Sequence, residues 1–70
     1  MIELHIKSKD GTITNTLINI RNLKWVDYLE VEKEIIIWFN SSLFISVTDE
    51  EIVGSVEDVY KRIKLLLMKN

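Results

Sequence analysis

His5 and Glu3 are the first residues of this chain whose types and spacing suit chemistry, because a histidine beside a carboxylate can transfer protons. They stand two residues apart in an alternating apolar–polar segment, so both side chains should point to one face of a strand. The pattern places no nucleophile beside them. We interpret His5 as an ordinary surface histidine and expect a protein that is not an enzyme.

The residue inventory argues against metal and cofactor chemistry. The 70-residue chain has no cysteine, one histidine and two glycines, too few for thiolate or zinc sites or for phosphate-binding loops. The acidic run Asp49, Glu50 and Glu51 lacks the spaced ligands and central glycine of a calcium loop. We interpret these acids as residues near a helix N-terminus, and we expect no metal, no cofactor and no small-molecule substrate.

Nucleic-acid binding would depend on a basic cluster near the C-terminus. Lys61 and Lys64 are three residues apart and can share a helix face with Arg62 beside them, and either tryptophan could stack on bases. Residues 27–58, however, carry nine acidic side chains against one lysine, a net charge of −8. Because nucleic-acid-binding domains usually present a broad basic surface, we keep this function only as the alternative.

Alternating and apolar segments predict five strands and one helix. The chain is an α+β domain over residues 1–70, in which a small antiparallel sheet carries one C-terminal amphipathic helix on one face. The polar early half of the second strand is expected at an exposed sheet edge, and the strand order is left open. The predicted strands cover residues 2–7, 12–20, 23–30, 35–39 and 43–48, and the predicted helix covers residues 55–68.

Two short sequences compete for the start of the helix. Residues 48–51 fit a capping box, in which a side chain at each end binds the backbone of the other, and residues 55–58 fit one if Asp58 stands in for glutamate. Gly54 lies between them and would cost a helix interior about 1 kcal/mol relative to alanine. We favour a helix that begins at Ser55, preceded by a turn or short helix over residues 49–53.

The segment 35–39 is apolar on both faces of its predicted strand. One helix covers one face of a sheet, and Ile36 and Trp38 fall on the other face. Val26 and Tyr28 of the preceding strand are expected beside them. Tryptophan is enriched at binding hot spots, so we predict a protein interface at these four residues, occupied by another protein or by a second copy in a homodimer. Burial in a small core is the alternative for both tryptophans.

Hydrophobic positions and a helix cap carry a family resemblance over most of the chain. The residues that carry it are Met1-Ile2-x-Leu4, Leu17-Ile18, Ile35-Ile36-Ile37, Ile45-x-Val47 and Ser55-Val56-Glu57-Asp58-Val59 continuing to Ile63. On these residues the chain resembles the small flagellar FlbD-like proteins and similar short β-rich proteins of bacteria and phages. The resemblance implies this fold and a non-enzymatic accessory role. The chain departs from the family at Asn40-Ser41-Ser42, where a glycine is usual, and in having residues 48–54 before the helix.

The expected function is therefore a small protein-binding module of regulatory or phage-encoded inhibitor type, which acts by occupying a partner's surface. The acidic surface of Asp49, Glu50 and Glu51 would orient it on a basic, nucleic-acid-binding target. The chain does not start with the apolar core of a signal peptide, and no stretch approaches the roughly 20 apolar residues that span a bilayer. We expect a soluble cytoplasmic protein without membrane contacts.

Overall fold

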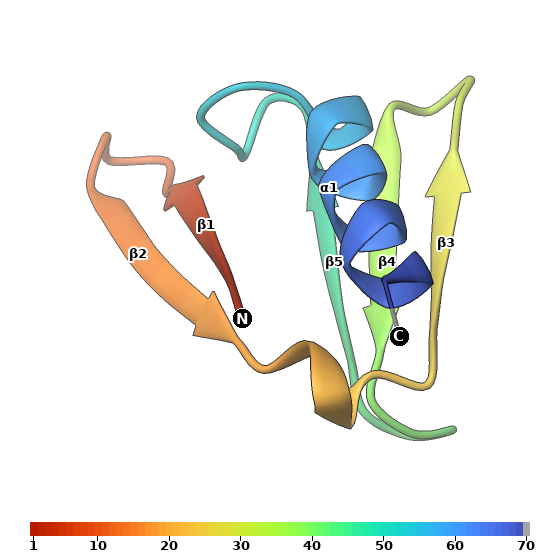
Figure 1. Cartoon of the computed structure of the whole chain (residues 1–70). Coiled ribbons are helices and arrows are strands. Elements are labelled where there is room, and N and C mark those ends of the chain that lie inside the picture. The colour runs from red at the N-terminus through yellow and green to blue at the C-terminus, as the bar shows by residue number, and fades with distance from the viewer. Residues whose placement is uncertain (70) are drawn as a thin grey trace.

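The computed structural model describes residues 1–69 and has five antiparallel strands and one α-helix (Figure 1). The predicted α+β class is confirmed, and each of the five strands and the α-helix lies within two residues of its predicted bounds. Within the described residues, no helix is long and apolar enough to cross a membrane. The elements are β1 (Ile2–Lys7), β2 (Ile13–Ile18), the 3-10 helix η1 (Ile20–Asn22), β3 (Trp25–Leu29), β4 (Glu34–Trp38), β5 (Phe44–Thr48) and α1 (Val56–Met68).

The strands are divided between two sheets rather than joined in one. β1 and β2 form a hairpin, and the other strands form a sheet in the order β3-β4-β5. β1 is joined to the segment between β5 and α1, where Ile6 bridges to Ile52 and the backbone N–H of Lys7 donates to the carbonyl of Glu51 at 2.7 Å. Figure 1 shows the hairpin diverging from the larger sheet, with α1 in front of that sheet. β2 lies at an edge and its early half is exposed, as predicted.

A turn after β5 explains the division. The Glu51 carboxylate accepts hydrogen bonds from the backbone N–H of Thr48 at 3.0 Å and from its hydroxyl at 3.1 Å. Residues 48–51 thus form a closed turn, which carries the chain away from β5 and toward β1. Gly54 follows with φ +107°, a left-handed conformation that favours glycine, so no helix passes through it.

The helix begins immediately after Ser55, as predicted. The Ser55 side chain accepts a hydrogen bond from the backbone N–H of Asp58 at 3.1 Å, which satisfies one of the free N–H groups of the first turn. Further along the helix, Glu57 and Lys61 form an ion pair at 3.7 Å.

One hydrophobic core joins the helix, the larger sheet and the inner face of the hairpin. Each buried aliphatic side chain contributes about 1.5–3 kcal/mol relative to an exposed one. Three of the buried residues come from the hairpin, so burial against α1 helps to hold the hairpin to the rest of the molecule. The buried residues are Ile2, Leu4, Ile18, Ile35, Ile37, Val47, Ile52, Val56, Val59 and Ile63.

Candidate protein-interaction surface

The sheet β3-β4-β5 has one face under α1 and one open face. Side chains alternate along a strand, and directly opposed residues of neighbouring strands share a face. Ile35 and Ile37 are fully buried in the core with α1, so Ile36 and Trp38 point to the other face, as predicted. The register assigns nine residues to this open face: Trp25, Asp27 and Leu29 on β3, Glu34, Ile36 and Trp38 on β4, and Phe44, Ser46 and Thr48 on β5.

Val26 and Tyr28 lie on the covered face, and the prediction that placed them beside Ile36 and Trp38 is wrong. Both residues pair directly with the buried isoleucines of β4. The Tyr28 ring also stacks on Tyr60 of α1, with centroids 5.2 Å apart. Alternation separates the two faces of each strand, but it does not tell which face of one strand continues which face of the next. The hairpin between the strands decides this.

The covered position changes the acidity of Tyr28. Burial beside the helix raises the pKa of its hydroxyl above 10.0, because the ionised form loses water. Negative charge on Glu57, and then on Glu30 and Asp49, raises the pKa further. Tyr28 is therefore a structural residue of the helix contact, with its hydroxyl near the acidic side of the molecule.

Three aromatic rings cross the open face, one from each strand, and we call Trp25, Trp38 and Phe44 the aromatic row. The central Trp38 ring stacks on Trp25, with centroids 5.2 Å apart and an interplanar angle of 20°. On its other side it tilts against Phe44, at 4.6 Å and 39°. Trp25 is 44% exposed and Phe44 is 50% exposed. The row is thus an ordered aromatic surface that solvent reaches.

Sequence reasoning missed two members of this row. The predicted third strand already placed Trp25 on the side opposite to Val26, but only the register connects Trp25 to Trp38. The sequence also indicated that Phe44 lies on the open face, because Phe44 alternates with Ile45, which packs on the core. Matching the two alternations across the hairpin would have added Phe44 to the predicted interface.

Two carboxylates lie among the apolar residues of the open face. The indole Nε1–H of Trp38 donates a hydrogen bond to Oδ2 of Asp27 at 3.0 Å, which fixes the ring by its edge. Toward the other end, the hydroxyl of Ser46 donates to the carboxylate of Glu34. The nine residues of the open face include no lysine, arginine or histidine. The face is therefore aromatic and acidic.

The predicted acidic surface lies in the turn between β5 and α1. Asp49 accepts a hydrogen bond from the backbone N–H of Val56 at 2.8 Å, which confirms that it serves the helix N-terminus. The Glu51 carboxylate is engaged by Thr48 within the turn. Glu50 is exposed. Two of the three predicted acids thus have local structural partners.

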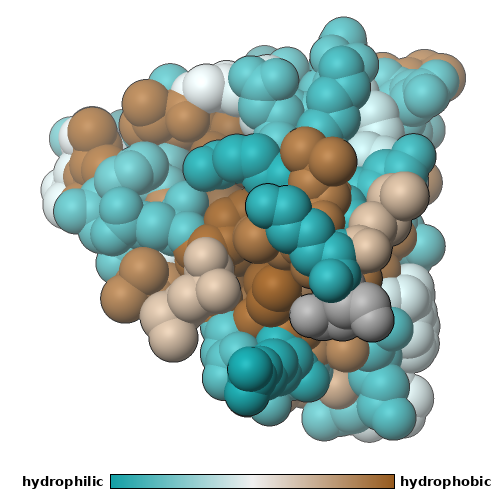
Figure 2. Space-filling model, viewed as in Figure 1, coloured by the Kyte–Doolittle hydropathy of each residue, from teal (hydrophilic) through white to brown (hydrophobic). Residues whose placement is uncertain are grey.

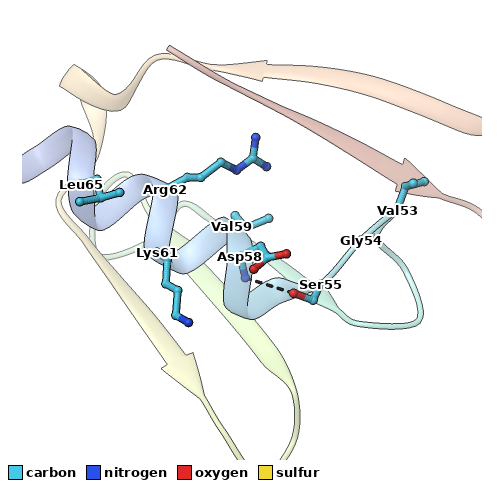
Figure 3. A pocket seen from close by; sticks show the side chains of 8 residues that line it. All are labelled: Val53, Gly54, Ser55, Asp58, Val59, Lys61, Arg62 and Leu65. Atoms are coloured by element: carbon cyan, nitrogen blue, oxygen red, sulfur yellow. Dashed lines mark hydrogen bonds between the residues drawn. The ribbon is translucent and has the colours of Figure 1, made fainter.

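The predicted basic cluster is divided between two grooves. Lys61 and Arg62 line a groove of about 340 Å³ beside residues 53–55, and Figure 3 shows their side chains pointing to different sides of α1. Lys64 lines a second groove, of about 370 Å³, which also contains Lys24 and Trp25. The three basic residues therefore do not line one shared groove.

Another apolar groove lies between α1 and the hairpin. Figure 2 shows hydrophobic side chains reaching the surface between these elements. The groove is lined mainly by Met1, Ile2, Leu65 and Leu66, and Arg62 lies at it. It contains no aromatic side chain among its lining residues, in contrast to the open face.

His5 and Glu3 share the outer face of the hairpin, as predicted. The Nε2 atom of His5 lies 3.4 Å from Oε1 of Glu3. The Nδ1 atom lies 2.5 Å from the side-chain oxygen of Asn15 on β2. Both ring nitrogens thus contact acceptor groups rather than a hydroxyl that they could activate as a nucleophile.

Comparisons with protein-family models, with curated proteins and with solved structures found no match for this chain. The resemblance to FlbD-like proteins therefore stays a prediction.

Proposed function

We propose that this protein is a small, non-enzymatic binding module that docks a protein on the open face of β3-β4-β5. The aromatic row is the observation that supports the proposal, because it places rings from three strands, with Trp25 and Phe44 about half exposed, on a face that α1 leaves uncovered. Aromatic side chains, tryptophan above all, are enriched among the residues that dominate binding energy. Ile36 extends the apolar centre, and Asp27 and Glu34 supply polar groups near it, which is the usual composition of an interface.

Either another protein or a second copy of the chain satisfies this proposal. Domains of this size have small cores and gain stability from association, and identical chains usually pair through a two-fold axis. A homodimer through the open face would bury the aromatic row of each chain against the other. Light scattering over a range of concentrations tells the two occupants apart.

Selection of peptides from an unbiased displayed library tests the proposal. We expect selected peptides to bind the wild-type protein and to lose at least about tenfold in affinity for Trp38→Asp, since hot-spot residues dominate binding. Leu17→Asp is the matched control, because Leu17 is also apolar and is 64% exposed on the hairpin. Phe44→Ser is a second test variant at a half-exposed position, in case Trp38→Asp disturbs folding. The proposal would be contradicted by peptides that bind the wild type and the three variants equally, or by a selection that yields no binders.

Nucleic-acid binding through α1 is the second candidate function. One observation favours it: Lys24 and Lys64 line the same groove as Trp25, which places positive charge near a tryptophan. Lys61 and Arg62 lie outside that groove, at the one beside residues 53–55. The acidic middle of the chain opposes a polyanion, so protein binding is the function we propose.

A further inference from the structure

The open face carries negative charge and no positive charge, which restricts the proteins that it can bind. Among its nine residues are Asp27 and Glu34, with no cationic side chain to neutralise either carboxylate. Burying a carboxylate without a partner is unfavourable, because the ion loses water and gains nothing in exchange. A protein that covers this face must therefore supply positive charge or leave both carboxylates exposed to water at the edge of the interface.

Neighbouring turns strengthen the negative potential at one end of the face. The backbone N–H of Asp49 donates to the carbonyl of Lys33 at 3.0 Å, which joins the turn after β3 to the turn after β5. Glu32, Asp49 and Glu50 line the groove at this junction together with Lys33, so three acidic side chains stand against one basic side chain. These charges lie in the turns next to Glu34 at the start of β4 and Thr48 at the end of β5.

The aromatic end of the face also suits a cation. Trp25 lies at the end of the row on the edge strand β3, so a ring neighbour covers only one side of it. Lys24 and Lys64 of the same chain line the groove between Trp25 and α1, whereas the open face itself has no cationic side chain. Arginine guanidinium groups stack on tryptophan rings and are attracted by about 0.5–1 kcal/mol at exposed sites. The hydrogen bond from Trp38 uses Oδ2 of Asp27, which leaves Oδ1 for a guanidinium that lies over the rings.

A second copy of the chain fits this face less well. Two-fold pairing through the open face would bring two copies of Asp27 and two of Glu34 into one interface without a cation from either face. Like charges placed close together oppose association. Contact between the open face of one copy and the basic residues of α1 of the next would join two different surfaces, and it would build a ring or an open chain rather than a two-fold dimer.

We propose that the open face binds a basic segment of another protein, whose arginine or lysine side chains stack on the aromatic row and pair with Asp27 and Glu34. This inference rests on the proposed function and adds the chemistry of the partner to it. Aliphatic side chains between the basic residues of the segment would contact Ile36, which lies near the centre of the face.

The composition of the selected peptides tests the inference separately from the proposed function. Among the peptides that depend on Trp38, we expect enrichment in arginine and lysine over the library. Their affinity should fall at least about tenfold when salt rises from about 50 to about 500 mM, because screening weakens exposed charge pairs. Neutral or acidic peptides that still depend on Trp38 would overturn the basic partner and leave the binding face intact. Peptides that do not depend on Trp38 would overturn both.

Charge variants of the protein provide a second test with a matched control. We expect the double variant Asp27→Asn, Glu34→Gln to bind the selected basic peptides about tenfold more weakly than wild type. Glu3→Gln removes one exposed carboxylate on the hairpin and should change affinity less than about twofold. Equal loss in the double variant and in Glu3→Gln would show a general charge effect and overturn the inference. A stable dimer that Trp38→Asp abolishes would identify a second copy as the occupant and also overturn it.

Discussion

Trp38 and Asp27 are joined across neighbouring strands by a hydrogen bond of 3.0 Å from the indole Nε1–H to the carboxylate. Asp27 is directly opposed to Ile36, so the bond runs diagonally to the next position of the same face. The indole is held by its edge, while its faces contact the rings of Trp25 and Phe44. The carboxylate therefore orients the central ring of the surface that we propose for binding.

Removal of this carboxylate should loosen the central ring. We expect Asp27→Ala to lower the free energy of unfolding by about 0.5–1 kcal/mol, the lower part of the range for a hydrogen bond because solvent reaches it. The Trp38 indole N–H signal in a nitrogen-15 NMR spectrum should shift strongly. Asp27→Asn keeps an acceptor oxygen and should have a smaller effect on both measurements. An unchanged indole signal in Asp27→Ala would contradict the geometry described here.

The two faces of β4 should respond differently to the loss of one methylene group. Ile37 is fully buried, so Ile37→Val should reduce the free energy of unfolding by about 0.5–1.5 kcal/mol. Ile36 lies on the open face and is only partly buried, so Ile36→Val should change it by less than about 0.5 kcal/mol. Urea unfolding of both variants measures the difference. Equal losses would mean that the open face is as well covered as the other.

Asp10 should titrate at unusually low pH. Hydrogen bonds from the Ser8 hydroxyl and from the backbone N–H of Thr12 stabilise its charged form and lower the pKa from 3.8 to about 2. The carboxylate thus stabilises the hairpin turn fully above pH 3.8, and this contribution is lost as the pH falls through about 2.

Carbon-13 NMR of the Asp10 carboxyl group measures this pKa directly, with the Thr12 amide signal as a second probe. Asp10→Asn should remove the transition of the Thr12 amide in this pH range. A carboxyl group that titrates near 3.8 would contradict the hydrogen-bonded turn.

The protein should not bind nucleic acid. We expect no change in fluorescence polarisation of labelled single-stranded or duplex DNA or RNA at low salt, because the net charge is −2 and the basic residues are divided between grooves. The triple variant Lys61→Gln, Arg62→Gln, Lys64→Gln should bind the selected peptides as wild type does. Nucleic-acid binding that disappears in the triple variant would support the second candidate function instead.

Local sequence patterns predicted the elements well because the apolar spacing and the end residues that mark each element lie within a few residues of one another. The apolar run of β4 placed Ile36 and Trp38 on the uncovered side, and Ser55 correctly marked the start of α1. Pairing between elements was harder. Val26 was assigned to the wrong face because strand register depends on the hairpin, and the position of the β1-β2 hairpin depends on the bridge from Ile6 to a distant segment. Neither relationship has a local signature.

The roles of the acidic residues at the candidate site were also hard to predict from local sequence. The net charge of the middle segment was visible in the sequence, and it directed attention to Asp49, which serves the helix N-terminus. Asp27 and Glu34 contribute to the same charge total but lie on the open face beside the aromatic row. Counting charges along the chain cannot distinguish these roles, because strand register decides which acids meet which rings.

The most direct test of the central claim is a nitrogen-15 NMR titration of the wild-type protein with a selected peptide. The indole N–H groups of Trp25 and Trp38 are separate probes on the open face, and the amides of β1 and β2 report on the hairpin. We expect both indole signals and the amides of Asp27 and Ser46 to shift on binding, while the hairpin amides stay in place. Shifts confined to the hairpin or to α1, with both indole signals unmoved, would show that binding occurs elsewhere and contradict the account.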